Sequence, residues 1–137
     1  NKKAQKELGF EYVELDDLLR SSEIISVHVP YNKHTFHLLN KDNLSLLKKG
    51  VVLINTSRGE LIESSSLYNS LRSGRISFAG LDVLEKGFKF NQRILRMKNV
   101  FVTPHNAANS NESKENMLNE TIENIKSFVS GNERNTL

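Results

Sequence analysis

The sequence predicts an α/β fold, namely part of a doubly wound parallel sheet followed by one long helix near the carboxyl end of the chain. Apolar, β-branched runs alternate with helical segments, and this alternation is typical of parallel sheets covered by helices. The run Val51-Val52-Leu53-Ile54 contains no polar residue, which predicts a strand buried on both faces. Two polar motifs each follow an apolar run directly, where an open α/β sheet presents its ligand-binding residues.

The first third of the chain predicts two helical segments and two strands. The helices are expected at residues 4–8 and 16–20, and the strands at residues 10–13 and 24–29. Gly9 ends the first helix because a helix terminus favours glycine, and Asp16 brings a favourable negative charge to the start of the second. Pro30 ends the second strand because proline cannot donate a hydrogen bond to a sheet.

The rest of the chain repeats a unit of helix followed by strand. Helices are expected to begin at Asn40, Ser64 and Gln92, and strands to cover residues 51–54, 76–83 and 100–102. Gly50 and Gly74 follow the first two of these helices as stop signals. Residues 111–129 carry apolar side chains at near-helical spacing, which predicts a long amphipathic helix.

Composition favours a soluble globular protein. With 137 residues, the chain is long enough for one compact domain. Nineteen Lys and Arg against 16 Asp and Glu give a net charge of +3, and because these charges are interspersed we expect no nucleic-acid partner. Cysteine is absent, and no apolar run reaches the roughly 18 residues of a membrane span. We therefore expect a cytoplasmic protein with no metal site and no membrane contact.

The glycine-rich turn that usually binds a dinucleotide in such a sheet is absent from this sequence. The motif is G-x-G-x-x-G, whereas the seven glycines stand at positions 9, 50, 59, 74, 80, 87 and 131. The first recognisable element is the tail of a helix, which is an unusual beginning for a domain. We therefore expect that the natural protein continues upstream and that this chain is a fragment of it.

The two polar motifs contain an arginine and a histidine with complementary chemistry. Arg58 lies in Asn55-Thr56-Ser57-Arg58-Gly59, and His105 lies in Thr103-Pro104-His105-Asn106-Ala107. A guanidinium can bind a substrate carboxylate through two parallel hydrogen bonds, and an imidazolium can donate a proton to a carbonyl oxygen. Together they fit the reduction of a keto acid by hydride transfer. The alternatives are a surface arginine at a helix start and a loop histidine in a structural hydrogen bond.

Several further motifs, in their order and spacing, resemble the carboxyl-terminal part of the D-isomer-specific 2-hydroxyacid dehydrogenases, and most closely the D-lactate dehydrogenase branch. Besides the two motifs above, the matching stretches are Ser26-Val27-His28-Val29-Pro30, Leu39-Asn40, Ser73-Gly74-Arg75-Ile76 and Ala79-Gly80-Leu81-Asp82-Val83-Leu84-Glu85. Each stretch alone is weak, but their order is specific. The resemblance extends to residues 121–126, which look like the last helix of that branch.

The resemblance implies a fold and an activity. Residues 1–109 would form the second half of a Rossmann-type NAD-binding domain, and residues 110–137 a helix that returns toward a substrate domain absent from this chain. The implied cofactor is NAD, the implied substrate is a small 2-hydroxy or 2-keto acid, with lactate and pyruvate favoured, and the full-length protein would be a homodimer. The isolated chain would be inactive because the glycine-rich loop lies upstream in the family.

The resemblance also implies roles for seven residues. Arg58 would bind the substrate and His105 would be the acid and base. The positions that match cofactor contacts are Asp82, near the nicotinamide end, and Val29, Pro30, Thr35 and Thr56, in the adenine and ribose region. Without the resemblance, these would be strand ends and loop residues that fill a sheet edge. The other histidines, His28, His34 and His37, are interpreted as structural or exposed.

One departure from the family pattern affects the catalytic histidine. The pattern is Asp-Val-Leu-Glu-x-Glu, whose second glutamate stabilises the charged imidazole and raises its pKa. Here that position is Gly87, and Glu85 matches the first glutamate. We therefore expect a weak dehydrogenase unless Glu85 fills the gap. The alternatives are a truncated or degenerate non-catalytic remnant of the family, a binding module, or a hydroxyisocaproate, glycerate or phosphoglycerate dehydrogenase.

Overall fold

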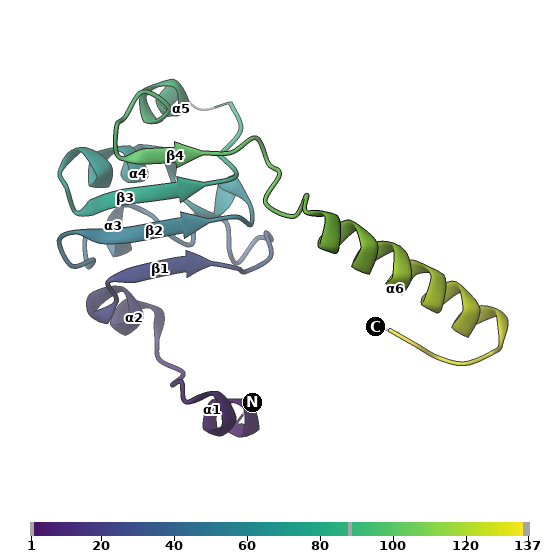
Figure 1. Ribbon diagram of the computed structural model, residues 1–137. Coiled ribbons are helices and arrows are strands. Elements are labelled where there is room, and N and C mark those ends of the chain that lie inside the picture. The colour runs from purple at the N-terminus through teal and green to yellow at the C-terminus, as the bar shows by residue number, and fades with distance from the viewer. Residues whose placement is uncertain (1, 88, 136–137) are drawn as a thin grey trace. The chain divides into compact units, whose positions relative to one another are not determined.

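Four parallel strands form one sheet in the computed structural model, which describes residues 2–87 and 89–135 (Figure 1). The strands are β1 (Ile24–Val27), β2 (Val51–Asn55), β3 (Ile76–Leu81) and β4 (Val100–Val102), and they lie in the order β1-β2-β3-β4. Each strand pairs in parallel with the next. The predicted α/β fold with a parallel sheet is confirmed.

Short helices connect the strands and precede the first of them. They are α1 (Lys2–Leu8), α2 (Leu15–Ser21), α3 (Lys41–Leu44), α4 (Ser64–Arg72) and α5 (Lys89–Ile94), with a 3-10 turn at Gly59–Leu61. The chain divides into two compact units, Asn1–Pro104 and His105–Leu137. The predicted domain boundary after residue 109 concerns the natural protein and stays a prediction.

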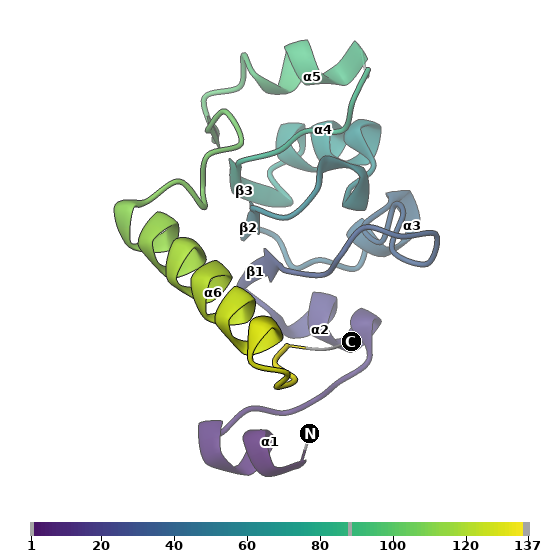
Figure 2. The ribbon, with the colours of Figure 1, turned by 90° about the vertical axis from the view of Figure 1, so that its right-hand side faces the viewer.

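The core lies between one face of the sheet and the helices α2 to α5, which lie on the same side of it (Figures 1 and 2). Leu53 and Ile76 are fully buried there. The prediction that residues 51–54 are buried on both faces is wrong, because β2 alternates between buried and half-buried residues. Its half-buried Val52 pairs with the exposed Ile24 and Phe78 across the other face. An unbroken apolar run thus lies under one layer of helices in the first unit.

The predicted strand at residues 10–13 is also wrong. The segment is irregular and belongs to none of the strand pairs that the structure describes. Tyr12 is 62% exposed and Val13 51% exposed. Their β-propensity reflects packing on a pleated surface, and here that surface begins only with β1. Other boundaries differ by a few residues, since β1 and β3 end two residues earlier than expected and α5 begins three residues earlier.

Helix α3 begins at a reciprocal cap. The side-chain oxygen of Asn40 accepts hydrogen bonds from the amides of Asp42, at 3.0 Å, and Asn43, at 3.3 Å. The side chain of Asn43 accepts in turn from the amide of Asn40 at 2.9 Å. This capping box satisfies amides that lack partners within the helix, and it explains why a helix of four residues forms at this point.

The second unit contains one helix, α6 (Asn111–Val129), whose bounds agree with the prediction. Ser110 caps it by accepting a hydrogen bond from the amide of Ser113 at 3.1 Å. Its apolar residues are exposed, among them Leu118 at 60% and Ile125 at 59%. In the part of the chain that the structure describes, neither α6 nor another helix is both long and apolar enough to cross a membrane.

Candidate active site

Six of the seven predicted site residues follow the carboxyl ends of neighbouring strands. Because the strands are parallel, these ends share one edge of the sheet (Figure 1). Val29, Pro30 and Thr35 follow β1, Thr56 and Arg58 follow β2, and Asp82 follows β3. His105 follows β4 by three positions and opens the second unit, so its convergence with Arg58 stays a prediction.

The turn that carries Arg58 is held by a buried amide. Asn55 is 1% exposed; its Nδ2 donates to the carbonyl of Arg58 at 2.9 Å, and its Oδ1 accepts from the amide of Ser57 at 3.0 Å. The hydroxyl of Ser57 donates to the carbonyl of Val27 at 2.9 Å, which ties the turn to β1. We call residues 55–60 the arginine turn. Its backbone is fixed while the Arg58 side chain is exposed.

Gly59 is required by a close approach of two backbone segments. A Cβ at this position would lie 2.1 Å from the carbonyl carbon of Leu84 and 2.3 Å from the nitrogen of Glu85. Real Cβ atoms essentially never come this close to other atoms. The glycine after Arg58 therefore lets the backbone of residues 84–85 lie directly against the arginine turn.

Glu85 is buried, and both of its carboxylate oxygens have partners. The side chain is 3% exposed, and its Oε1 lies 2.7 Å from Nε2 of His37. Its Oε2 accepts from the amide of Ser64, the first residue of α4, at 3.1 Å. The carboxylate is thus committed within the first unit. It is not free to replace the glutamate that the family pattern has at position 87.

Gly87 itself is exposed, and its backbone is left-handed with φ of +74°. Apart from Gly87 and its chain neighbours, no described residue has an atom within 4 Å of a Cβ built there. A glutamate side chain would therefore have room, although an L-residue pays about 1–2 kcal/mol for this conformation. The departure from the family pattern removes a carboxylate without filling its space.

The loop after β1 is ordered by Thr35. Its hydroxyl donates to the carbonyl of Pro30 at 2.7 Å and accepts from the amide of Asn32 at 2.8 Å. Thr35 and Val29 are half-buried, and Pro30 is exposed. These partly accessible positions fit a role in lining a ligand site.

Asp82 is 4% exposed and lies at the end of β3. Its carboxylate accepts a hydrogen bond from the hydroxyl of Thr103, and its amide donates to the carbonyl of Asn55 at 2.9 Å. Thr56, on the neighbouring strand end, is exposed. Asp82 is thus anchored to β2 and to the residue that follows β4, which places its carboxyl group at the same edge of the sheet as the arginine turn.

Among His28, His34 and His37, only His37 is half-buried, while the other two are exposed. The sequence interpretation of His37 as structural or exposed misses its pairing with Glu85, a residue 48 positions away. No local pattern signals this contact. His28 lies beside Ser26, with Nε2 2.7 Å from the serine hydroxyl.

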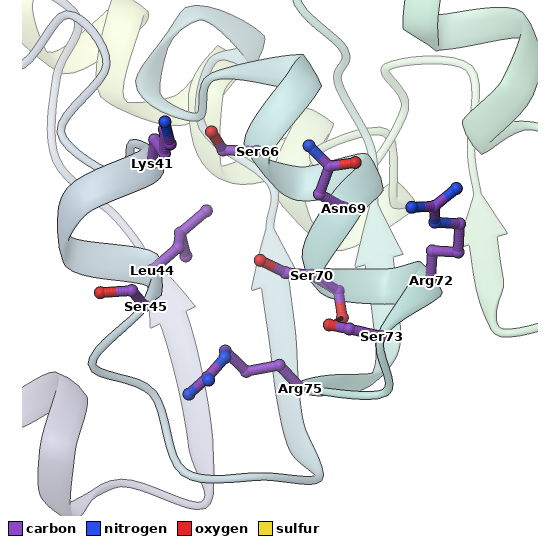
Figure 3. A pocket seen from close by; sticks show the side chains of 9 residues that line it. All are labelled: Lys41, Leu44, Ser45, Ser66, Asn69, Ser70, Arg72, Ser73 and Arg75. Carbon is purple, nitrogen blue, oxygen red and sulfur yellow. Dashed lines mark hydrogen bonds between the residues drawn. The ribbon is translucent and has the colours of Figure 1, made fainter.

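A pocket of about 360 Å³ lies between α3 and α4 (Figure 3), and its lining includes none of the predicted site residues. It is lined by Lys41, Leu44, Ser45, Ser66, Asn69, Ser70, Arg72, Ser73 and Arg75. The carboxylate of Glu63 accepts from the amide of Lys41 and the hydroxyl of Ser66, so a negative charge offsets the basic lining. Within residues 2–87 and 89–135, no three His, Cys, Asp or Glu residues are grouped so as to hold a metal ion.

Known proteins match nearly the whole chain. Residues 1–107 match the family described as D-isomer specific 2-hydroxyacid dehydrogenase, NAD binding domain. A glyoxylate reductase from Thermococcus litoralis is 38% identical over 128 residues, which cover 93% of this chain and 39% of the relative. A hydroxypyruvate reductase from Thermotoga maritima is 36% identical over 126 residues, covering 90% of this chain and 41% of the relative.

Solved structures agree with this match. A D-lactate dehydrogenase from Aquifex aeolicus, complexed with NAD and lactic acid, superimposes with a TM-score of 0.82 at 39% identity, covering 96% of this chain and 44% of that one. The chain spans about two fifths of the length of the curated relatives it matches. The cofactor of the matched domain is NAD, as the resemblance implies. The chain belongs to the NAD-binding domain family of the D-isomer specific 2-hydroxyacid dehydrogenases.

Proposed function

We propose that the protein containing this chain reduces a small 2-keto acid with NADH, and oxidises the corresponding D-2-hydroxy acid in reverse. The observation that carries the proposal is the gathering of six predicted site residues at the carboxyl edge of β1, β2 and β3. Pyruvate is the proposed keto acid. Glyoxylate and hydroxypyruvate, named for two of the similar reductases, are the competing substrates.

Arg58 is proposed to bind the substrate carboxylate. Its side chain is exposed at the sheet edge, while its carbonyl is fixed by the buried Asn55. A guanidinium that forms two parallel hydrogen bonds with a carboxylate also fixes the orientation of the adjacent keto group. The exposed fork on a rigid turn is what such orientation requires.

His105 is proposed to donate a proton from its imidazolium to the keto oxygen and to remove it in the reverse direction. A carboxylate beside an imidazole favours the charged form, and the family pattern supplies one at the position of Gly87. Without it, no carboxylate at this position stabilises the imidazolium that the proton transfer requires. We therefore propose a slow enzyme, because Glu85 is committed to other partners.

NAD supplies the hydride acceptor or donor when it is bound. Thr35 and Val29 are half-buried and Thr56 and Pro30 exposed, which suits residues that line the cofactor, and the anchored carboxylate of Asp82 suits its nicotinamide end. The glycine-rich loop that would bind the pyrophosphate is absent from this sequence. We therefore expect the isolated chain to bind NADH at least about 100-fold more weakly than the complete enzyme, since two lost charge-assisted bonds account for that factor.

The test uses a joined protein, in which an upstream segment from a family member, with its glycine-rich loop and substrate domain, precedes residue 1. We expect NADH oxidation with pyruvate, glyoxylate or hydroxypyruvate, and loss of that activity in His105→Gln. Arg58→Lys keeps the charge but loses one of two parallel bonds, so kcat/KM falls about 10- to 100-fold. Equal activity in Arg58→Lys and the parent contradicts the proposed role.

A non-catalytic remnant of the family is the second candidate, favoured by Gly87. A joined protein that binds NADH in calorimetry but oxidises none of it with any of the three acids supports this candidate. The homodimer and the cytoplasmic location that the sequence analysis expects stay predictions. Sedimentation of the joined protein tests the first of them.

A further inference from the structure

A closed ring of contacts connects His37, Glu85 and the arginine turn. The Glu85 carboxylate pairs with the His37 imidazole at 2.7 Å, and the amide of His37 donates to the carbonyl of Glu60 at 2.9 Å. Glu60 follows Gly59, and Gly59 lies directly against the backbone of Glu85. The ring thus returns to the residue from which it began, and it encloses the position next to Arg58.

The segment around His37 is ordered in an unusual conformation. His37 has φ of +49°, a left-handed conformation that residues other than glycine adopt only when their surroundings impose it. Its ring stacks on that of Phe36 with centroids 3.9 Å apart. The next residues run alongside the segment that follows the arginine turn, since Leu39 and Ile62 form a parallel bridge. The contacts with Glu85 and Glu60 therefore offset a local backbone cost.

The hydrogen-bond chemistry requires an acceptor at position 85. One carboxylate oxygen accepts from the amide of Ser64, and the other lies 2.7 Å from Nε2 of His37, which donates in the tautomer that carries its proton there. A glutamine would keep both contacts by donating to Nε2 of the other tautomer, so Glu85→Gln does not break the ring. A methionine of similar length lacks the carboxylate, and it leaves the amide of Ser64 and the His37 ring without this partner, which is costly in so buried a place. Glu85→Met is thus the change that breaks the ring.

We propose that His37 and Glu85 are a positioning pair, which holds the arginine turn against the loop after β1 so that Arg58 meets the substrate carboxylate. This inference rests on the proposed function. The pair acts through the arginine turn and does not contact the substrate itself. Loss of either partner loosens the turn and weakens keto-acid binding, while the folded state and the binding of NADH persist.

The kinetic test compares Glu85→Met, His37→Asn and the double variant in the joined protein, well below the unfolding temperature of each. We expect KM for pyruvate to rise about tenfold in each single variant and no further in the double variant, because both changes break one ring. The dissociation constant for NADH stays within about twofold of the parent. His28→Asn, which removes a comparable imidazole contact outside the ring, leaves KM unchanged.

An unchanged KM in Glu85→Met, or single-variant effects that multiply in the double variant, overturns the inference. If the parent joined protein is inactive, the proposed function fails and the pair is judged in the 137-residue chain by amide hydrogen exchange. There, Glu85→Met should speed exchange of the His37 and Ser64 amides about tenfold and leave the amide of Leu53 in β2 unchanged. Equal acceleration at all three amides indicates global destabilisation and also overturns the positioning role.

Discussion

Replacing Gly59 by alanine should destabilise the protein more than other glycine changes in the sheet region. The added Cβ would lie 2.1 Å from the carbonyl carbon of Leu84 and 2.3 Å from the nitrogen of Glu85. Ordinary contacts begin at 3.4 Å, so one backbone segment has to retreat by more than an ångström. Overpacking against flexible side chains costs about 1–3 kcal/mol, and here neither side is a flexible side chain. We therefore expect a loss of about 3 kcal/mol or more.

Urea unfolding followed by circular dichroism measures this loss. A loss of about 3 kcal/mol is a large part of the 5–15 kcal/mol of a typical domain, and with m of about 1–3 kcal/mol/M it lowers the midpoint by about 1 M or more. The matched control is Gly80→Ala in β3, whose Cβ would lie 3.0 Å from the end of the Ile54 side chain. That side chain can turn aside, so the control costs less than about 1 kcal/mol. Equal losses in the two variants would refute the reasoning.

Three further outcomes follow from local contacts. Hydrogen bonds lower the pKa of Glu63 in the folded protein, and the bond from Ser66 has the largest effect. The stability that Glu63 contributes is therefore fully present above its ordinary pKa of 4.5. It is lost as the pH falls through the folded-state pKa. Glu63→Gln should flatten the acid side of a plot of unfolding free energy against pH. Asn40→Ala removes the cap of α3 and should cost about 1 kcal/mol in urea unfolding. If His105 needs a carboxylate beside it, Gly87→Glu should raise kcat of the joined protein near neutral pH. Gly87→Gln, which bears the same backbone cost, should not raise it. Equal rates in the two variants would contradict the proposal that a carboxylate is missing at position 87.

The sequence suffices to predict the order of the main elements because most of their signals are local. The apolar runs predict all four strands, and Asn40 and Ser64 lie at or next to the starts of their helices. The prediction of a strand at residues 10–13 is wrong because β-propensity does not indicate whether a neighbouring strand exists. The two-sided burial of residues 51–54 fails for a related reason, since periodicity does not reveal how many layers cover a sheet.

The prediction of the site likewise succeeds where the signal is local and fails where it depends on the tertiary arrangement. Arg58 and Asp82 lie at the sheet edge because they follow strands, and this position can be recognised from the sequence. The pairing of His37 with Glu85 depends on the folded backbone and on the close approach at Gly59, and no spacing rule connects residues 48 positions apart. The meeting of Arg58 with His105 likewise depends on tertiary geometry, and it remains the main prediction for the joined protein.

The apolar sheet face of the first unit, opposite its helices, has a practical consequence for the purification of this chain. Ile24, Phe78 and Phe101 are 69%, 40% and 62% exposed, and contiguous apolar surface of this kind promotes association. Light scattering should therefore increase with protein concentration, and a hydrophobic dye such as ANS should fluoresce in the presence of the native chain. Replacing Phe78 and Phe101 by threonine, which retains β-propensity, should reduce both signals and yield samples suited to spectroscopy.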